Sequence, residues 1–298
     1  MPLSSTRPRT DPLTDLRHLT PRDRRLLAWL AEHQTLTTHQ IATALFPSLR
    51  AAQKRLTLLY RIGAVDRFTF AHVPGITGGL RYTLGPLGNL LHPQPGRRQT
   101  MLQRRVDIAR NPKLDHLLGV NTFFTDLAGH TRSHPDTGLV RWWSEQHATA
   151  AYSLAGIHPD GHGIWRHHGH TVGFFLEHDR GTENHRTLLA KLPAYQRLAV
   201  AGPRYPLLFH LPNSDREANL HRNLTHLRLP VTVATTVHSA HPADPVWSVV
   251  GSGWPRLRLD QLPSDHGPDG VANASRYTDP GRDNEPTLVT ATDRAVRR

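Results

Sequence analysis

The chain has 298 residues, enough for two ordinary domains, and it contains no cysteine, which excludes disulfides and cysteine-ligated zinc or iron–sulfur centres. Its formal net charge is +12, and all of this excess lies in residues 1–113, which hold 18 Lys/Arg and 6 Asp/Glu, against 18 of each in residues 114–298. A basic segment joined to a neutral one is typical of a polyanion-binding domain attached to a second domain, because phosphate neutralisation drives non-specific nucleic-acid affinity. The alternative is a surface bias that serves only solubility.

No stretch has the apolar length of a signal-peptide core or of a membrane-spanning helix. We therefore expect a soluble, cytoplasmic protein without a membrane partner. Composition and charge predict five parts, which are a disordered arm over 1–19, a DNA-binding domain over 20–90, a basic linker or connecting helix over 91–112, an α/β domain over 113–259 and a disordered tail over 260–298.

Three helices are predicted at the start of the first domain. Thr20 begins the first helix with a capping box, and Thr37 begins the second helix in the same way. The third helix runs from about residue 48 to 62 and ends at Gly63.

The third predicted helix has two distinct faces at about 100° per residue. Its apolar face consists of Leu49, Ala52, Leu56 and Leu59. Its basic and hydroxylated face consists of Arg50, Lys54, Thr57 and Arg61. Such a division is typical of a recognition helix in a DNA major groove, and the alternative is an ordinary amphipathic helix whose charged face is solvated.

A β-hairpin is predicted after the helices, from an alternating strand at 65–70, a turn-rich loop and a second strand at 80–84. Three short helices followed by a hairpin resemble the winged helix-turn-helix modules of bacteria. The resemblance implies double-stranded DNA as the partner, the third helix in the major groove, and Arg67 and Arg81 of the wing near phosphates. A protein-interaction module with the same fold is the alternative.

The neutral domain alternates helices and strands. A long apolar-faced helix begins at Leu114. Strands are predicted at 139–143, 148–157, 171–177, 205–211 and 231–237, with helices at 183–200 and 215–227. The order αβββαβαβ predicts an α/β domain with a mixed central sheet.

The chain is rich in histidine, with 22 in all. A run of them, His167, His168 and His170, lies near His158 and His162. Because histidine is scattered over the whole chain, we interpret this run as a compositional bias and predict no dedicated histidine–metal site.

Carboxylates form the most informative pattern in the neutral domain. They are Glu145, Asp160 in the motif HPDG, and the pair Glu177 and Asp179. The spacing of Asp160 and Glu177 suits adjacent antiparallel strands joined by the turn-rich GHGIWRHHGH. Two carboxylates at neighbouring strand ends predict an oxygen site for Mg²⁺, with Asp160 and Glu177 as ligands and Glu145 as an addition. Each motif taken alone is common in turns and on solvated surfaces.

These motifs resemble two groups of proteins. The element order with Asp160 and Glu177 resembles the PD-(D/E)xK nuclease superfamily, whose sheet holds a metal between an Asp and a Glu. The winged helix followed by HPDG, FFLEHDRGTE and Lys191-x-x-x-Tyr195 is similar to the replication-relaxation family of plasmid and mobile-element proteins, over residues 20–240. This second resemblance implies a role in replication, relaxation or mobilisation of plasmid DNA, with proteins of these processes or a second copy of the chain as further partners.

One position departs from the nuclease pattern, because Asp179 occupies the place of its lysine. We expect Lys191 on the following helix to return a cation to the site, with Tyr195 on the same face and Arg180 as a second candidate. In the alternative, Asp179 is only a turn residue at the strand end. The predicted functions are a Mg²⁺-dependent endonuclease that nicks or cleaves DNA, a non-catalytic regulator of replication or transcription, or a protein-interaction adaptor. The residues expected to catalyse in the first case are Asp160, Glu177, Asp179 and Lys191.

Overall fold

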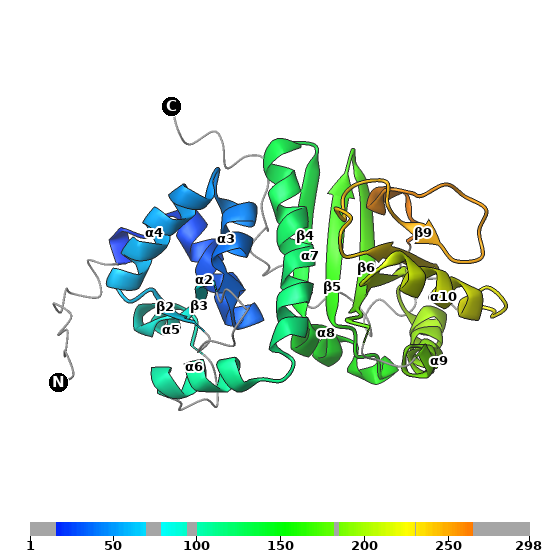
Figure 1. The fold of residues 1–298 in the computed structure, drawn as a ribbon, viewed down its shortest axis with the longest axis horizontal. Helices are drawn as coiled ribbons and strands as arrows, with labels where there is room; N and C mark the ends of the chain where they lie inside the picture. The colour runs from blue at the N-terminus through cyan, green and yellow to red at the C-terminus, as the bar shows by residue number, and fades with distance from the viewer. Residues whose placement is uncertain (1–15, 70–78, 94–99, 182–184, 230, 265–298) are drawn as a thin grey trace. The chain divides into compact units, whose positions relative to one another are not determined.

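The structure is a computed structural model that describes residues 16–69, 79–93, 100–181, 185–229 and 231–264. The chain divides into two compact units, residues 1–121 and 122–298 (Figure 1). The predicted disordered arm up to residue 15, the loop of the hairpin over 70–78 and the predicted tail from residue 265 lie outside the described residues. Within the described part of the chain, no helix combines the length and the apolar character needed to cross a bilayer.

The first unit consists of helices packed around a small antiparallel sheet. Its elements are α2 (Pro21–His33), β1 (Leu36–Thr37), α3 (Thr38–Leu45), α4 (Leu49–Arg61), β2 (Val65–Phe68), β3 (Arg81–Leu84), α5 (Pro86–Leu91) and α6 (Met101–Arg110). The strand order is β1-β3-β2, with both pairs antiparallel. The three predicted helices and the two strands of the predicted hairpin are therefore present, and the segment expected as a linker or helix contains α6.

Side-chain caps determine where the helices of this unit begin. Thr20 and Thr37 each accept a hydrogen bond from the backbone N–H three residues later, and the side chains of Asp23 and Gln40 return the bond. Both predicted capping boxes are therefore confirmed. The apolar faces of the three helices form a common core, which includes Leu26, Leu30, Ile41, Ala44, Leu56 and Leu59.

The second unit is a mixed six-stranded sheet with helices on its faces. Its elements are α7 (Leu114–Ser133, of which the part from residue 122 belongs here), β4 (Thr137–Ser144), α8 (Glu145–Ala151), β5 (Gly161–His167), β6 (His170–His178), α9 (His185–Ala201), β7 (Leu207–Leu211), α10 (Ser214–Leu224), β8 (Val233–Val237) and β9 (Ser248–Val249). The strand order is β4-β5-β6-β7-β8-β9. The pairs β6–β7 and β7–β8 are parallel and the others antiparallel, which confirms the mixed α/β class.

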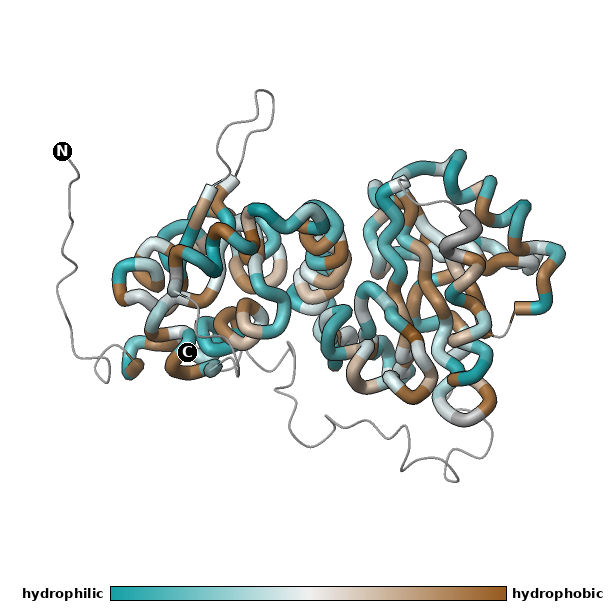
Figure 2. Tube along the Cα trace, turned by 90° about the horizontal axis from the view of Figure 1, so that it is seen from below, coloured by the Kyte–Doolittle hydropathy of each residue, from teal (hydrophilic) through white to brown (hydrophobic). Residues whose placement is uncertain are grey.

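Different helices cover the two faces of this sheet (Figure 1). On one face, Phe123 of α7 packs edge-on against Phe174 at 6.0 Å, and Phe124 stacks on Trp142 at 5.3 Å. On the other face, α9 and α10 enclose a core that includes Phe175, Tyr195, Leu198, Leu207, Phe209 and Leu220. The apolar segments of this unit run through its central strands in Figure 2. Because successive residues of a strand point to opposite faces, neighbouring residues of β6 lie in different layers.

One predicted strand is wrong. Residues 148–157 lie in α8 and in a 3-10 turn, because Ser144 caps a segment rich in alanine, the strongest helix former. The second strand of the sheet is instead β5, formed by the glycine-rich segment that was expected to be a turn. Gly163 suits this strand, since a Cβ there would lie 2.3 Å from the ring of Phe174. The turn shrinks to His168 and Gly169, both with positive φ. The predicted order αβββαβαβ is otherwise present, with α8 and β9 as additions.

Candidate functional site

Three acidic residues occupy one end of three neighbouring strands. Ser144, Gly161 and Leu176 are paired across β4, β5 and β6. The next residues outward are Glu145, Asp160 and Glu177. Asp160, just before β5, and Glu177, next to the last residue of β6, therefore lie at the same end of adjacent antiparallel strands, as predicted. The backbone N–H of Asp160 donates to the carbonyl of Leu176 at 2.9 Å, and its Oδ2 accepts the backbone N–H of His178 at 2.7 Å.

Glu177 is the centre of this end of the sheet, and its side chain is almost completely buried. Its Oε2 accepts a hydrogen bond from Lys191 Nζ of α9, and its Oε1 accepts one from the hydroxyl of Tyr195 at 3.0 Å. Lys191 and Tyr195 thus share a helix face that points at Glu177, as their spacing predicted.

The environment of Glu177 disfavours its ionised form. Burial, followed by the negative charge of Asp160, raises the pKa of Glu177 to about 8, although Lys191 and Tyr195 act in the opposite direction. Burial and the charge of Glu177 raise the pKa of the Tyr195 hydroxyl well above its ordinary value. Two carboxylates that repel each other at the end of a sheet form a donor set suited to a hard divalent cation, which prefers oxygen ligands.

Asp179 and Glu145 stand apart from this centre. Asp179 Oδ2 accepts a hydrogen bond from Arg216 Nε of α10 at 2.6 Å, and its Oδ1 accepts the backbone N–H of Gly181 at 2.7 Å. This is the geometry of the alternative in which Asp179 is a turn residue beyond the strand end. Glu145 is exposed at the start of α8. Two groups of three residues in the described part of the chain are close enough to hold a metal ion, and Glu145, Asp160 and Glu177 belong to neither of them.

The outer face of α4 is the second candidate site, and it belongs to the first unit. Its four predicted contact residues, Arg50, Lys54, Thr57 and Arg61, are all exposed. On the opposite side, Ala52, Leu56 and Leu59 are buried. The predicted division of this helix into a buried apolar face and an exposed basic face is confirmed.

Side chains beside this face are held by internal contacts. Arg55 of α4 pairs with the buried Asp23, so that this arginine fixes α4 to α2. On the hairpin, the guanidinium of Arg67 lies 4.4 Å from the ring centre of Tyr60 and remains partly exposed. Arg81 is only 8% exposed, and burial lowers its pKa. Arg67 is consequently better placed than Arg81 to meet a phosphate.

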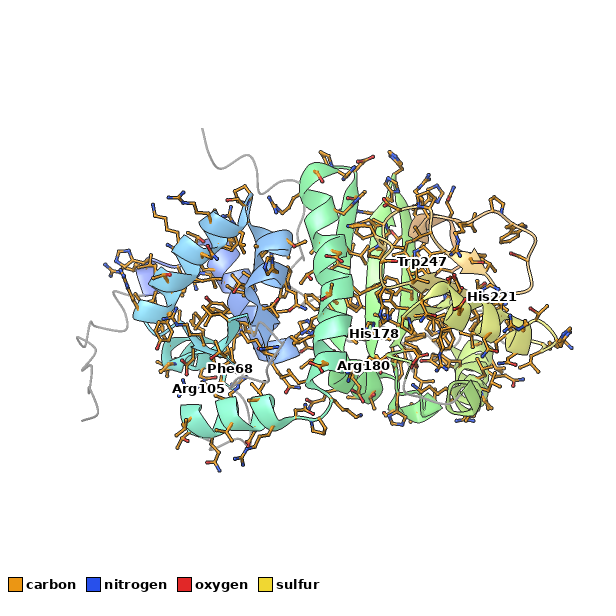
Figure 3. All side chains as sticks on the ribbon, in the orientation of Figure 1. Phe68, Arg105, His178, Arg180, His221 and Trp247 are labelled. Atoms are coloured by element: carbon orange, nitrogen blue, oxygen red, sulfur yellow. The ribbon has the colours of Figure 1, made fainter. Side chains whose placement is uncertain are left out.

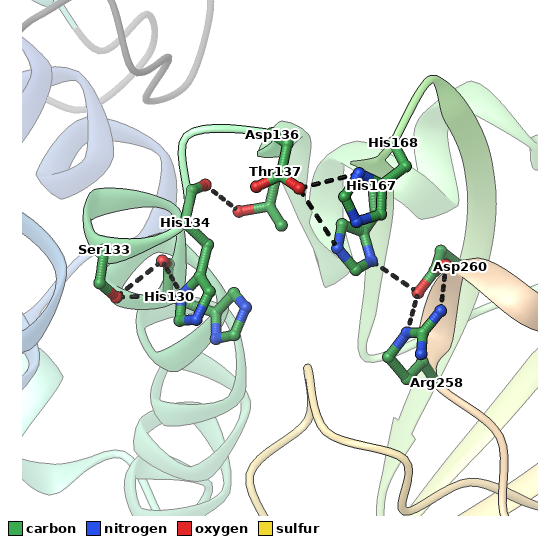
Figure 4. Close-up of polar contacts among 9 residues, drawn as sticks. All are labelled: His130, Ser133, His134, Asp136, Thr137, His167, His168, Arg258 and Asp260. Carbon is green, nitrogen blue, oxygen red and sulfur yellow. Dashed lines mark hydrogen bonds and ion pairs between the residues drawn. The ribbon is translucent and has the colours of Figure 1, made fainter.

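The histidine run divides between two environments. His162 is buried in the sheet, where its Nδ1 contacts the carbonyl of Phe174 at 2.8 Å, and burial together with the charge of Arg141 lowers its pKa to about 3. His168 Nδ1 lies 2.8 Å from Asp136 Oδ2, and His167 Nδ1 lies 3.0 Å from Asp260 Oδ1 (Figure 4). Asp136, His167 and His168 are close enough to share an ion, on an exposed part of the unit.

A second histidine group, His178, His210 and His238, was not predicted from the sequence. These residues come from β6, β7 and the position after β8. The available signal was a histidine at or near the end of each of three consecutive predicted strands, in the segments FFLEH, LLFHL and ATTVH. Such a signal becomes visible only when the strands are placed side by side.

Comparison with known proteins gives one match. The family model described as replication-relaxation matches residues 27–207, more than half of the chain. The matched range includes all of α4 and also Asp160, Glu177 and Lys191. No curated protein and no solved structure is significantly similar to the chain.

Proposed function

The chain belongs to the replication-relaxation family, which implies a role in replication or mobilisation, and on this premise we propose that it acts there by binding double-stranded DNA. In this proposal, residues 20–90 form a winged helix, α4 enters the major groove, and the hairpin of β2 and β3 lies along the backbone. The observation that carries the proposal is the outer face of α4, on which three cations and a hydroxyl are exposed together and which has no acidic residue in the helix.

The chemistry of this face fits a duplex. Arg50, Lys54 and Arg61 project at helical spacing from one side of α4. Each cation that meets a phosphate releases condensed counterions, and an arginine can also bind the edge of a guanine through two parallel hydrogen bonds. Arg67 extends the same cationic surface onto the hairpin. Arg81 contributes to the packing of the hairpin in this proposal, because it is buried.

For the second unit, the proposal is a nuclease-like site of the PD-(D/E)xK kind. Asp160 and Glu177 would hold Mg²⁺, which when bound lowers the pKa of a coordinated water and screens the charge of a phosphodiester. Lys191 donates to Glu177 and keeps a positive charge at the site. Tyr195 fixes the other oxygen of Glu177 and so orients the carboxylate. The two units then divide the work, with the first binding the duplex and the second acting on its backbone.

A non-catalytic accessory protein is the second candidate, and a specific observation favours it. Both oxygens of Glu177 already accept hydrogen bonds from Lys191 and Tyr195. Asp179, at the position of the nuclease lysine, is held by Arg216 and by the following turn. In this case the chain binds DNA and leaves it intact.

Supercoiled plasmid, incubated with the protein with and without Mg²⁺ or Mn²⁺, separates these functions in one gel. Band shift without the metal reports binding, and the Arg50→Ala/Lys54→Ala/Arg61→Ala variant should lose it. Metal-dependent nicking that disappears in Asp160→Ala but persists in the surface control Asp136→Ala supports the nuclease. A shift without nicking supports the accessory protein, and the absence of a shift even at low salt contradicts DNA binding.

A further inference from the structure

Three histidines converge on the face of the sheet opposite to Glu177. His178 ends β6 and is paired with His210 of the parallel strand β7. His210 is in turn paired with Thr236 of β8, and His238 follows two residues later on the same face. Figure 3 shows His178 at the end of β6. The three imidazoles thus come from three adjacent parallel strands, at their carboxyl ends.

The rings are already arranged as ligands of one ion would be. A ring nitrogen of each histidine lies within 4.8 Å of those of the other two. The Nδ1 atoms of His178 and His210 are 3.1 Å apart and form a hydrogen bond, so that two of the three rings already contact each other. The Nε2 of His238 is 3.0 Å from the carbonyl oxygen of His210. The backbone of Asp179 is a second hydrogen-bond partner of the His238 ring, so a bound ion would replace one of these two contacts.

One ring nitrogen of this group lacks a hydrogen-bond partner among the described residues. His210 is 4% exposed, and its Nε2 is buried without a hydrogen-bond partner among the described residues. Leaving a buried polar atom unpaired destabilises a fold, so such an atom calls for an explanation. Apolar rings lie next to His210, with Phe123 at 5.4 Å between ring centres.

We propose that His178, His210 and His238 bind one divalent transition-metal ion, with zinc as the probe, and that water completes the coordination. Three imidazoles suit zinc, cobalt, nickel or copper, whereas Mg²⁺ prefers oxygen ligands. The site is therefore distinct from the carboxylates on the other face of the sheet. No further acidic or histidine side chain within the described residues joins the group, and the half-buried His238 leaves it open to solvent. The bound ion would join the ends of three parallel strands and stabilise the second unit.

The test uses the full chain with His167→Ala and His168→Ala, which removes the exposed group with Asp136 and leaves the buried histidines intact. Zinc titration by calorimetry should give one tight site per chain and raise the melting temperature. Cobalt should give the strong visible absorption of a four-coordinate site. Adding His238→Asn or His210→Ala should weaken zinc binding by at least about 10-fold and abolish the cobalt absorption.

A matched control is His221→Ala, since this half-buried histidine bonds to Thr235 at 2.7 Å outside the group and its loss should leave zinc affinity unchanged. Circular dichroism shows whether each variant is folded. His238 is half-buried and lies beyond the end of β8, so His238→Asn should remain folded. This variant therefore still tests the proposal if His210→Ala unfolds. Equal zinc affinity and equal cobalt absorption with and without His238→Asn overturn the proposal, as does the absence of a tight site in the starting variant.

Discussion

Replacing Glu177 with glutamine should change how the stability of the protein depends on pH. The pKa of this buried carboxyl is about 8, against an ordinary value of 4.5. Between these values, the folded chain keeps a proton on Glu177 that the unfolded chain has lost, and folding is favoured by that proton. The contribution of Glu177 to stability is therefore fully present below pH 4.5 and is lost as the pH rises to about 8.

The difference between wild type and Glu177→Gln from pH 6.5 to 8 isolates this effect, because all other titrating groups are present in both proteins. The pKa values of the buried His162 and His210 are lowered to about 3 from 6.5, so their contribution is present above pH 6.5 and is lost only as the pH falls below it. At pH 6.5 such histidines, which include His130 with a pKa of about 4, are still half protonated in the unfolded state, so they stabilise the fold further as the pH rises, by the same amount in both proteins. One proton changes the free energy of unfolding by about 1.4 kcal/mol per pH unit, so wild type should lose roughly 2 kcal/mol relative to Glu177→Gln over the interval.

Urea unfolding of wild type and Glu177→Gln at several pH values from 6.5 to 8 measures this loss. Glutamine is neutral and retains an oxygen that can accept from Tyr195, so the variant should lack this loss and become more stable relative to wild type as the pH rises. Glu145→Gln removes an exposed carboxylate and should run parallel to wild type. Parallel profiles of wild type and Glu177→Gln across the whole interval would refute the raised pKa.

Two further substitutions test packing in the two units. Asp23→Ala removes both the capping box of α2 and the partner of Arg55. It should destabilise the protein by about 2–4 kcal/mol, measured by denaturant unfolding, and a loss below about 1 kcal/mol would contradict the structural role of the pair. Gly163→Ala places a Cβ 2.3 Å from the ring of Phe174 and should lower the free energy of unfolding by about 1–3 kcal/mol. Gly138→Ala should change the melting temperature little, because the nearest neighbour of its Cβ is a flexible arginine side chain at 3.4 Å. Equal melting temperatures for these two glycine variants would contradict the packing described for β5.

The features that the sequence predicted correctly are those set by local spacing. The capping boxes at Thr20 and Thr37 and the two faces of α4 depend on residues within one or two turns of each other. The approach of Asp160 to Glu177 follows from the register of a short hairpin, and that of Lys191 and Tyr195 from one helix face. In each case the chain itself holds the partners close together, so spacing is sufficient evidence.

The features that the sequence did not predict depend on contacts between distant segments. Gly161 and Gly163 indicate a turn when read alone, but they lie in β5 because rings of α7 and β6 occupy the space where their Cβ atoms would be. The histidine group depends on the order in which β6, β7 and β8 pair, which the sequence does not reveal residue by residue. The burial of Arg81 likewise results from the tertiary fold, since its strand pairs with both β1 and β2.

The salt dependence of duplex binding tests the proposed DNA-binding function most directly. Fluorescence anisotropy over a series of salt concentrations measures the binding of a labelled duplex. The proteins compared are wild type, the triple variant Arg50→Ala/Lys54→Ala/Arg61→Ala and the control Arg222→Ala, which replaces an exposed arginine of α10. Because each phosphate contact contributes about 0.9 to the slope of log K against log salt, the triple variant should bind more weakly with a slope smaller by up to roughly 3, while Arg222→Ala should match wild type. Equal affinity and slope for wild type and the triple variant would contradict the role assigned to α4.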